Sequence, residues 1–252
     1  MSEIPSVKES LNYDEINQII INNYSAFTKE YTTFLSEWLT DTNKIFKDSE
    51  KFYILIYIFN KNLEFFNNNL IEFDYFTFDQ TTRFDIQKIN IVEIAKNLNI
   101  AKETTRRKIV ELENAGVIKR KKKQILIDKS SFVLFNVKNT IKSLTSLVFR
   151  IYNICVQEGI ITKKVTRDEI NNKIEKKFSF IMHHYFEFII PWTIRWKTFF
   201  DNDLELFIIW SVIVLNKSVK MMKGENEKFN IEKWRSEIEK LNTQGINTMS
   251  LS

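Results

Sequence analysis

The amino-acid sequence predicts a mainly α fold built from helical bundle segments, and two observations predict it. The 252 residues include only four glycines and two prolines, whereas sandwiches, barrels and nucleotide-cradling folds use these residues freely at turns. Apolar residues also recur at three- and four-residue spacing through most of the chain, which is the period of an amphipathic helix.

Residues 1–70 are expected to form an N-terminal helical region. A first amphipathic helix is predicted by a row of apolar residues: Ile16, Ile20, Tyr24, Phe27, Tyr31, Phe34, Leu35 and Trp38. A second helix is predicted from about Ser49 to Asn68, and its nearly apolar composition indicates a central position. Residues 71–86 are aromatic and alternate in part, which favours a loop with short strand content.

A helix-turn-helix is predicted next. Asn90 followed by Glu93 is typical of an N-cap with a capping box, and it opens a short helix that ends at Leu98. After a tight turn, a longer helix is predicted over residues 102–114, and Gly116 would end it because glycine accepts a positive φ. The polar side of this second helix faces away from the apolar side that would pack on the first helix.

Positive charge is gathered in the same part of the chain. Residues 101–123 hold nine cations and three anions, so this segment carries a charge of +6. Since the whole chain carries +5, the remaining residues together carry about −1. The last five cations lie between two short apolar runs, which predicts a β-hairpin with a cationic tip. Residues 71–135 are therefore predicted to be a winged helix-turn-helix, and a local basic surface of this kind indicates binding to nucleic acid.

Residues 93–118 resemble a known family. The run EIAKNLNIAKETTRRKIVELENAGVI is similar to the DNA-binding domain of the cyclic-AMP receptor protein family, whose pattern is close to EIA..LG.(T/S)RETVSR.L..LE..G.I. The positions that match are Glu93, Ile94, Ala95, Leu98, Glu103, Thr104, Arg107, Leu112, Glu113, Gly116 and Ile118. About 26 of the 252 residues are covered, and the match is more specific for winged-helix DNA binding than for that family.

The resemblance implies how double-stranded DNA would be contacted. Residues expected to face base edges in the major groove are Lys102, Glu103, Arg106 and Arg107, of which Arg106 also suits a phosphate. Residues expected to contact phosphates are Thr104, Lys108, Lys119, Arg120, Lys121, Lys122 and Lys123.

Four departures from the family pattern matter. Asn99 stands where glycine is usual, and asparagine tolerates the left-handed conformation. Ala101 replaces the usual helix-capping Ser or Thr, and Thr105 replaces a core Val. The helical pattern of residues 1–70 has none of the glycines of the family's cyclic-nucleotide domain, so no cyclic-nucleotide effector and no other cofactor is expected.

Residues 136–178 are predicted to form connecting helices. Apolar residues alternate three- and four-residue steps from Val137 to Cys155, which favours a long helix, either packed on its own protein or pairing with a second copy. Thr166 and Glu169 form a capping box that starts another helix, and Pro191 is expected to kink or end that helix.

Residues 179–252 are predicted to repeat the N-terminal part of the chain. Residues 20–27 align with 181–188 at an offset of 161, residues 50–58 with 205–213 at an offset of 155, and Ile89 with Ile246 at an offset of 157. We therefore expect a tandem duplication whose second copy stops inside a second helix-turn-helix at Ser252, as in a truncated chain.

Other functional classes lack the residues they need. A single cysteine excludes an intrachain disulfide and indicates a reducing compartment, and no metal-ligand cluster is recognisable. His183 and His184 point about 100° apart on a helix, so packing is expected of them. No glycine loop or nucleophile–base spacing indicates an enzyme. The acidic N-terminus and an apolar stretch of about ten residues, 206–215, favour a cytoplasmic protein without a membrane partner.

The function predicted from sequence is therefore that of a sequence-specific transcriptional regulator, acting either as a homodimer or as an intrachain pseudo-dimer. One alternative is a plasmid-type replication initiator, because such proteins resemble duplicated winged helices. The other is a noncatalytic helical protein-interaction module.

Overall fold

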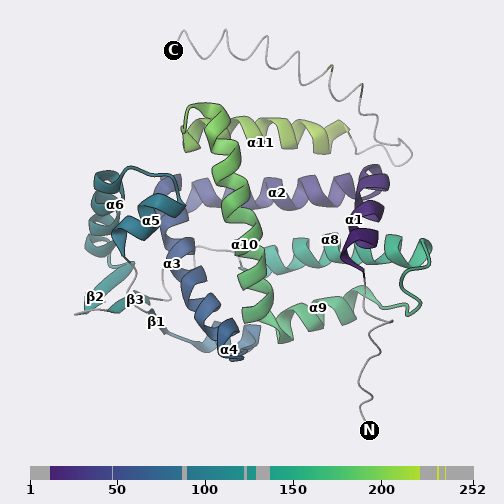
Figure 1. The fold of residues 1–252 in the computed structure, drawn as a ribbon, viewed down its shortest axis with the longest axis horizontal. Coiled ribbons are helices and arrows are strands. Elements are labelled where there is room, and N and C mark those ends of the chain that lie inside the picture. The colour runs from purple at the N-terminus through teal and green to yellow at the C-terminus, as the bar shows by residue number, and fades with distance from the viewer. Residues whose placement is uncertain are drawn as a thin grey trace. The chain divides into compact units, whose positions relative to one another are not determined.

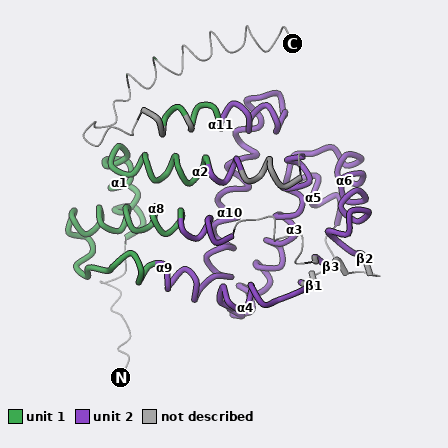
Figure 2. The backbone as a smooth tube through the Cα atoms, turned by 180° about the vertical axis from the view of Figure 1, so that it is seen from behind, with its two compact units in different colours: residues 1–36, 143–170, 213–252 green, residues 37–142, 171–212 purple. Residues whose placement is uncertain are grey.

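The computed structural model describes residues 12–46, 48–86, 90–121, 124–128 and 137–221, and singly residues 232 and 236. It is mainly α, as predicted, with one small sheet (Figure 1). The chain divides into two compact units, one made of residues 37–142 and 171–212 and the other of residues 1–36, 143–170 and 213–252 (Figure 2). Among the described helices, none is long and apolar enough to cross a bilayer.

Unit 2, residues 37–142 and 171–212, which is purple in Figure 2, has two long helices at its centre, α3 (Ser49–Asn68) and α10 (Phe178–Lys197). The bounds of α3 are those predicted, and every residue from 52 to 59 is buried. Two buried polar pairs join the helices: the Tyr53 and Thr193 hydroxyl oxygens lie 2.7 Å apart, and His183 Nδ1 lies 3.0 Å from Asn60 Oδ1. These pairs fix how α10 lies along α3.

Pro191 was predicted to kink or end its helix; α10 continues through this residue, so the predicted end is wrong. An interior proline costs about 3 kcal/mol or more, because it removes one backbone hydrogen bond and crowds the preceding turn. Pro191 itself is exposed, whereas Ile189, Ile190 and Thr193 are buried around it. Burial of those neighbours supplies the free energy that keeps the helix intact.

Residues 71–86 form more structure than the predicted loop. Helix α4 (Tyr75–Gln80) begins after Asp74, whose side chain accepts a hydrogen bond from the Thr77 backbone N–H at 2.7 Å. Strand β1 (Arg83–Ile86) follows and confirms the expected strand content. The helix was missed because aromatic residues have modest helix propensity, and here the burial of Phe78 against Phe84 decides the conformation.

A winged helix-turn-helix lies within the predicted range 71–135. Its helices are α5 (Ile91–Asn97) and α6 (Lys102–Asn114), and its wing strands are β2 (Ile118–Lys121) and β3 (Gln124–Asp128). The sheet is antiparallel in the order β1-β3-β2, with both Phe84 and Ile118 paired to Ile127. These three side chains are buried, so β1 closes the module as a third strand that the hairpin prediction lacked.

Unit 1, which is green in Figure 2, contains helix α1 (Tyr13–Asn22), the start of α2 (Tyr24–Phe46), most of α8 (Val137–Gln157), the start of α9 (Arg167–Lys176) and the end of α11 (Leu204–Met221). The single amphipathic helix predicted over residues 16–38 is broken at Asn23, whose side chain bonds Glu158 Oε1 at 3.2 Å. The predicted capping box is confirmed, because the Thr166 backbone N–H donates to Glu169 at 2.7 Å and the Glu169 N–H donates to Thr166 Oγ1 at 3.2 Å.

Two stretches of the chain have the same order of helices. Helices α1 and α9 have ten residues each, and both contain Asp-Glu-Ile-Asn, at residues 14–17 and 168–171. A single residue then separates each of them from a long helix, α2 or α10. Further identical residues stand at the same offset of 154: Ile20 and Ile174, Ser25 and Ser179, Tyr31 and Tyr185, Phe34 and Phe188, Trp38 and Trp192, and Phe46 and Phe200.

Helices α3 and α11 extend this correspondence at an offset of 155. Each follows an aspartate whose carboxylate accepts a backbone N–H three residues on, Asp48 from Lys51 at 3.1 Å and Asp203 from Leu206 at 2.9 Å. For α1 and α2 against α9 and α10, the helix boundaries favour an offset of 154 residues. The apolar residues alone had indicated an offset of 161. The two offsets differ by seven residues, and a shift of one heptad preserves the apolar pattern of a helix. Residues 246–252 lie outside the described residues.

Candidate nucleic-acid interface

The two helices of the helix-turn-helix pack through mainly apolar side chains. Ile94, Leu98 and Ile100 are buried against the second helix, from which Thr105, Ile109 and Leu112 are buried in turn. The Asn90 side chain caps α5 by accepting the Val92 N–H at 3.0 Å. A well-packed inner face leaves the orientation of α6 relative to α5 little freedom.

Each local departure from the family pattern has a visible structural result. Asn99 has a φ of 49°, so it adopts the left-handed conformation expected in the turn. Ala101 offers no side-chain cap to α6, as predicted. Thr105 fits the core because its hydroxyl donates to the Ala101 carbonyl oxygen at 3.1 Å, which satisfies a polar group at a buried position.

The four residues predicted to face base edges are brought together on the outer side of α6. Lys102, Glu103, Arg106 and Arg107 are all exposed, and the two arginine side chains are each 66% accessible. Arg106 Nε lies 3.4 Å from Glu103 Oε2, and Arg107 Nε lies 3.7 Å from Glu111 Oε1. Surface pairs of this kind contribute little to stability, so the guanidinium groups remain available to a ligand.

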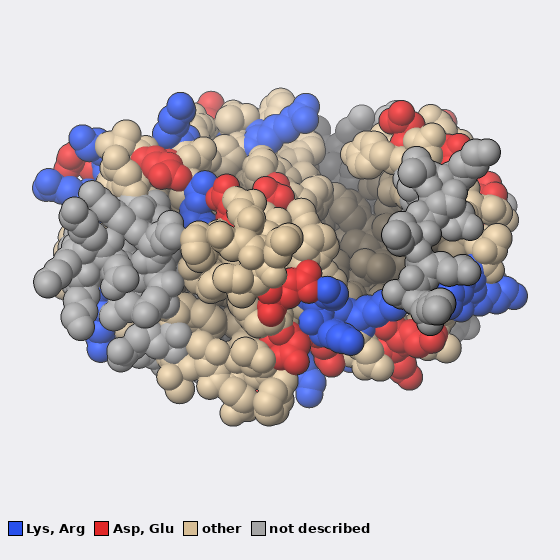
Figure 3. All heavy atoms as spheres, turned by 60° about the horizontal axis from the view of Figure 1, so that its bottom comes forward, with Lys and Arg blue, Asp and Glu red and all other residues tan. Residues whose placement is uncertain are grey.

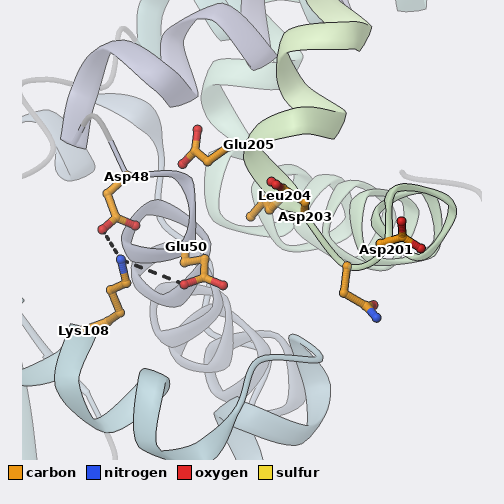
Figure 4. A pocket seen from close by; sticks show the side chains of 8 residues that line it. Asp48, Glu50, Lys108, Asp201, Asp203, Leu204 and Glu205 are labelled. Atoms are coloured by element: carbon orange, nitrogen blue, oxygen red, sulfur yellow. Dashed lines mark hydrogen bonds and ion pairs between the residues drawn. The ribbon is translucent and has the colours of Figure 1, made fainter. Parts of the chain in front are cut away.

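Lys108 lies on the opposite side of the same helix. Its side chain is 14% exposed, and its ammonium group pairs with the carboxylate of Asp48 and lies 3.9 Å from Glu50 Oε2 (Figure 4). Burial alone would raise the pKa of Asp48, but the hydrogen bond from Lys108, together with the Lys51 N–H and both lysine charges, lowers that pKa below its ordinary value. Lys108 thus joins α6 to the start of α3.

A second anchor holds the turn between the two helices. Lys197, at the end of α10, is 2% exposed and donates from Nζ to the Asn99 carbonyl oxygen at 2.9 Å. Asn99 Nδ2 donates to Asn202 Oδ1 at 2.7 Å. Burial lowers the pKa of Lys197, while Glu50 and Asp203 act in the opposite direction. Sequence analysis missed this anchor, because Lys197 follows an aromatic run far from the motif and nothing local marks it as buried.

An acidic hollow of about 550 Å³ lies beside the pair of Lys108 and Asp48 (Figure 4). The residues that line it are Asp48, Glu50, Lys108, Asp201, Asn202, Asp203, Leu204 and Glu205. Glu205 also accepts the Ser49 N–H at 2.7 Å, so it helps to hold the start of α3. Five carboxylates disfavour a phosphate backbone at this hollow.

The wing is described in part. Lys119 is exposed on β2, whereas the side chains of Arg120 and Lys121 and the whole of Lys122 and Lys123 lie outside the described residues. Thr104 is half-buried on α6. On the face of the molecule shown in Figure 3, Lys and Arg side chains are interspersed with Asp and Glu.

The comparison with protein families identifies this module. Residues 84–127 match the model of a DeoR-like helix-turn-helix domain. The matched range begins in β1 and ends in β3, so it covers the helix-turn-helix and its sheet, and it is not a match to the cyclic-AMP receptor family. No curated protein and no solved structure shows significant similarity to the chain. The chain therefore carries, at residues 84–127, a DNA-binding helix-turn-helix domain of the DeoR-like kind found in transcription regulators.

Proposed function

We propose that the protein is a sequence-specific transcriptional regulator that inserts α6 into the major groove of double-stranded DNA. One observation carries the proposal: Lys102, Glu103, Arg106 and Arg107 are exposed together on a helix whose other side is packed. An arginine can bond guanine O6 and N7 in a bidentate manner, and a carboxylate can accept from cytosine N4. Each such pair contributes about 1 to 3 kcal/mol of discrimination between bases.

The wing and the start of α6 supply the contacts that do not depend on sequence. In the proposal Lys119, Arg120, Lys121, Lys122 and Lys123 lie against phosphates, and Thr104 donates its hydroxyl to a phosphate as the helix enters the groove. Lys108 is given a positioning role in place of a phosphate contact, because its ammonium group is paired with Asp48. Phosphate contacts release counterions, so they determine how steeply affinity falls with salt.

The decisive experiment is selection of bound duplexes from a random pool, followed by gel-shift titration of the selected sequence at several salt concentrations. Arg107→Ala is expected to relax the preference at one base pair, while Lys119→Ala weakens all sequences alike and lowers the salt slope by about one. Lys173→Ala, an exposed cation on α9, is the matched control and is expected to change neither quantity. Absence of any retardation at low salt would favour the helical protein-interaction module instead.

We propose further that two half-sites are bound, either by a homodimer or by two modules of one chain. A dimer places equivalent helices about one turn of DNA apart, so its site is a palindrome. The ratio of protein to DNA in the complex, measured by light scattering, distinguishes two chains per site from one. A single half-site bound by a single chain would contradict both forms.

A replication initiator is the second candidate, and the repeated order of helices favours it. Two copies related along one chain would bind sites that are repeated head to tail, whereas a symmetric dimer requires an inverted repeat. The support is the correspondence between residues 13–59 and 167–214, with Asp-Glu-Ile-Asn and an aspartate-capped helix in both. Selected duplexes that contain direct repeats would support the initiator, and palindromes would support the regulator.

A further inference from the structure

The only two histidines of the chain lie side by side on α10, His183 and His184. His183 is 4% exposed, whereas His184 and Glu187 are exposed. Neighbouring side chains of a helix diverge, which is why packing was expected of the pair. Glu187 can nevertheless lie near both histidines, because it stands four residues after His183 and three after His184. Both spacings bring side chains together on a helix.

The three side chains converge on one point. Glu187 Oε2 lies 3.6 Å from His183 Nε2 and 3.1 Å from His184 Nδ1. One potential ligand atom from each side chain can be chosen so that all three lie within 4.8 Å of one another. Tetrahedral zinc with bonds of about 2.0 to 2.2 Å needs its ligand atoms about 3.3 to 3.6 Å apart. The separation between His183 Nε2 and Glu187 Oε2 already has this size, and the exposed His184 ring can turn to adjust the other two.

The orientation of His183 is set by α3. Its Nδ1 lies 3.0 Å from Asn60 Oδ1, and an amide oxygen can only accept, so Nδ1 carries the hydrogen. Nε2 of the neutral ring therefore directs its lone pair toward the Glu187 carboxylate. A hydrogen bond of this kind to the distal nitrogen is how proteins commonly orient a metal-binding imidazole.

His183 and Glu187 place two possible ligand atoms face to face. With the hydrogen on Nδ1, the Nε2 lone pair of His183 is directed at the Glu187 carboxylate, whose Oε2 lies 3.6 Å away, so the lone pair and the carboxylate repel each other. A positive ion between the two nitrogens and the oxygen would remove this repulsion.

We propose that His183 Nε2, His184 Nδ1 and Glu187 Oε2 bind one divalent transition-metal ion of the zinc type, with water in the remaining position. Two imidazoles and one carboxylate suit Zn²⁺, Co²⁺ or Ni²⁺, whereas Mg²⁺ and Ca²⁺ prefer oxygen alone. The site lies on α10, away from α6, so it is independent of the residues proposed to contact DNA. Asn60 is its orienting partner and not a ligand.

The test uses the full chain without a histidine tag, titrated with Zn²⁺ by calorimetry and with Co²⁺ by absorption spectroscopy. One ion per chain is expected, with cobalt bands of a nitrogen-ligated site. Because the chain has no other histidine, imidazole ligation can come only from this cluster. His184→Ala and Glu187→Gln change exposed side chains, and each is expected to weaken Zn²⁺ binding at least tenfold. Asn60→Ala is expected to weaken it about 10- to 100-fold.

The matched control is Glu15→Gln, an exposed carboxylate on α1, which is expected to bind Zn²⁺ as the unaltered chain does. Binding should also weaken as the pH falls and the imidazoles are protonated. Absence of saturable binding at micromolar Zn²⁺ would overturn the proposal. The proposal would also be overturned if His184→Ala and Glu187→Gln bound Zn²⁺ with the same affinity as the Glu15→Gln control. Gel-shift results on DNA bear on neither outcome.

Discussion

Three consecutive cations of α6 lie in two different environments. Arg106 and Arg107 are each 66% exposed, whereas the side chain of Lys108 is 14% exposed and paired with Asp48. Successive residues of a helix are rotated by about 100°, so the third cation of such a run turns back toward the protein. A count of charge places all three in one basic surface, but the structure leaves two of them exposed and pairs the third with Asp48.

The largest expected effect is on the exposed pair. The double change Arg106→Ala and Arg107→Ala is expected to reduce affinity for the selected duplex by roughly 100-fold or more, because each arginine contributes about 1 to 3 kcal/mol. The melting temperature should stay the same, since exposed ion pairs contribute little to folding. Gel-shift titration and thermal unfolding measure the two quantities.

The control for this change removes the same charge elsewhere. Lys29→Ala with Lys173→Ala alters two exposed cations on α2 and α9 and is expected to leave affinity within about twofold. If control and test variants lost affinity equally, α6 would contribute only through net charge.

The buried cation is expected to affect stability first. Lys108→Met leaves the half-buried Asp48 carboxylate without its ammonium partner, which should lower the free energy of unfolding by about 1 to 3 kcal/mol. Adding Asp48→Asn should restore part of the loss, because no charge is then left unpaired. A double-mutant cycle in urea measures the coupling, and additive losses would show that the pair is not coupled.

The turn anchor is expected to have an intermediate effect. Lys197→Met keeps the apolar stem but leaves the part-buried hydrogen bond of the Asn99 carbonyl oxygen without its donor, at a cost of about 1 to 2 kcal/mol. DNA affinity should fall severalfold, because α6 begins two residues after the turn that has been loosened. Hydrogen exchange of the Ile100 amide, which bonds Ala95 at 3.0 Å, should become faster than in Lys173→Ala. Unchanged exchange would assign Lys197 to packing alone.

The dependence of stability on pH separates Asp48 from other carboxylates. Its pKa is lowered in the folded state, so its ion pair contributes fully above the ordinary aspartate pKa of about 3.9 and is lost as the pH falls through the lower, folded value. Unfolding of the unaltered chain between about pH 4 and 2 should therefore be steeper than unfolding of Asp48→Asn. Parallel curves would mean that Lys108 does not hold the carboxylate ionised.

The smallest effect is a gain. Ala101→Ser provides the missing cap at the start of α6 and is expected to raise the free energy of unfolding by about 0.5 to 1 kcal/mol. Ala101→Val, which cannot cap, is the comparison, and both are measured by urea unfolding. If serine gave no advantage over valine, the first amides of α6 would have other partners.

Local patterns predicted the parts of this molecule that local interactions determine. The bounds of α3, the cap at Asn90 and the left-handed Asn99 all follow from a few neighbouring residues. The break at Asn23 and the continuation through Pro191 did not, since both depend on packing against segments distant in sequence.

The candidate interface divides in the same way. Helical periodicity placed Lys102, Glu103, Arg106 and Arg107 on one side of α6, and the structure agrees. The anchors at Lys108 and Lys197 were beyond sequence analysis, because their partners lie 60 and 98 residues away along the chain.

Helix α10 acts mechanically as a rod of about 30 Å, the length of its twenty residues at 1.5 Å each. Near one end His183 is tied to Asn60, and at the other end Lys197 is tied to the turn of the helix-turn-helix. One continuous helix thus contacts both α3 and the turn that precedes α6. The start of α6 is therefore held in place by a side chain that comes 98 residues later in the chain than the turn itself.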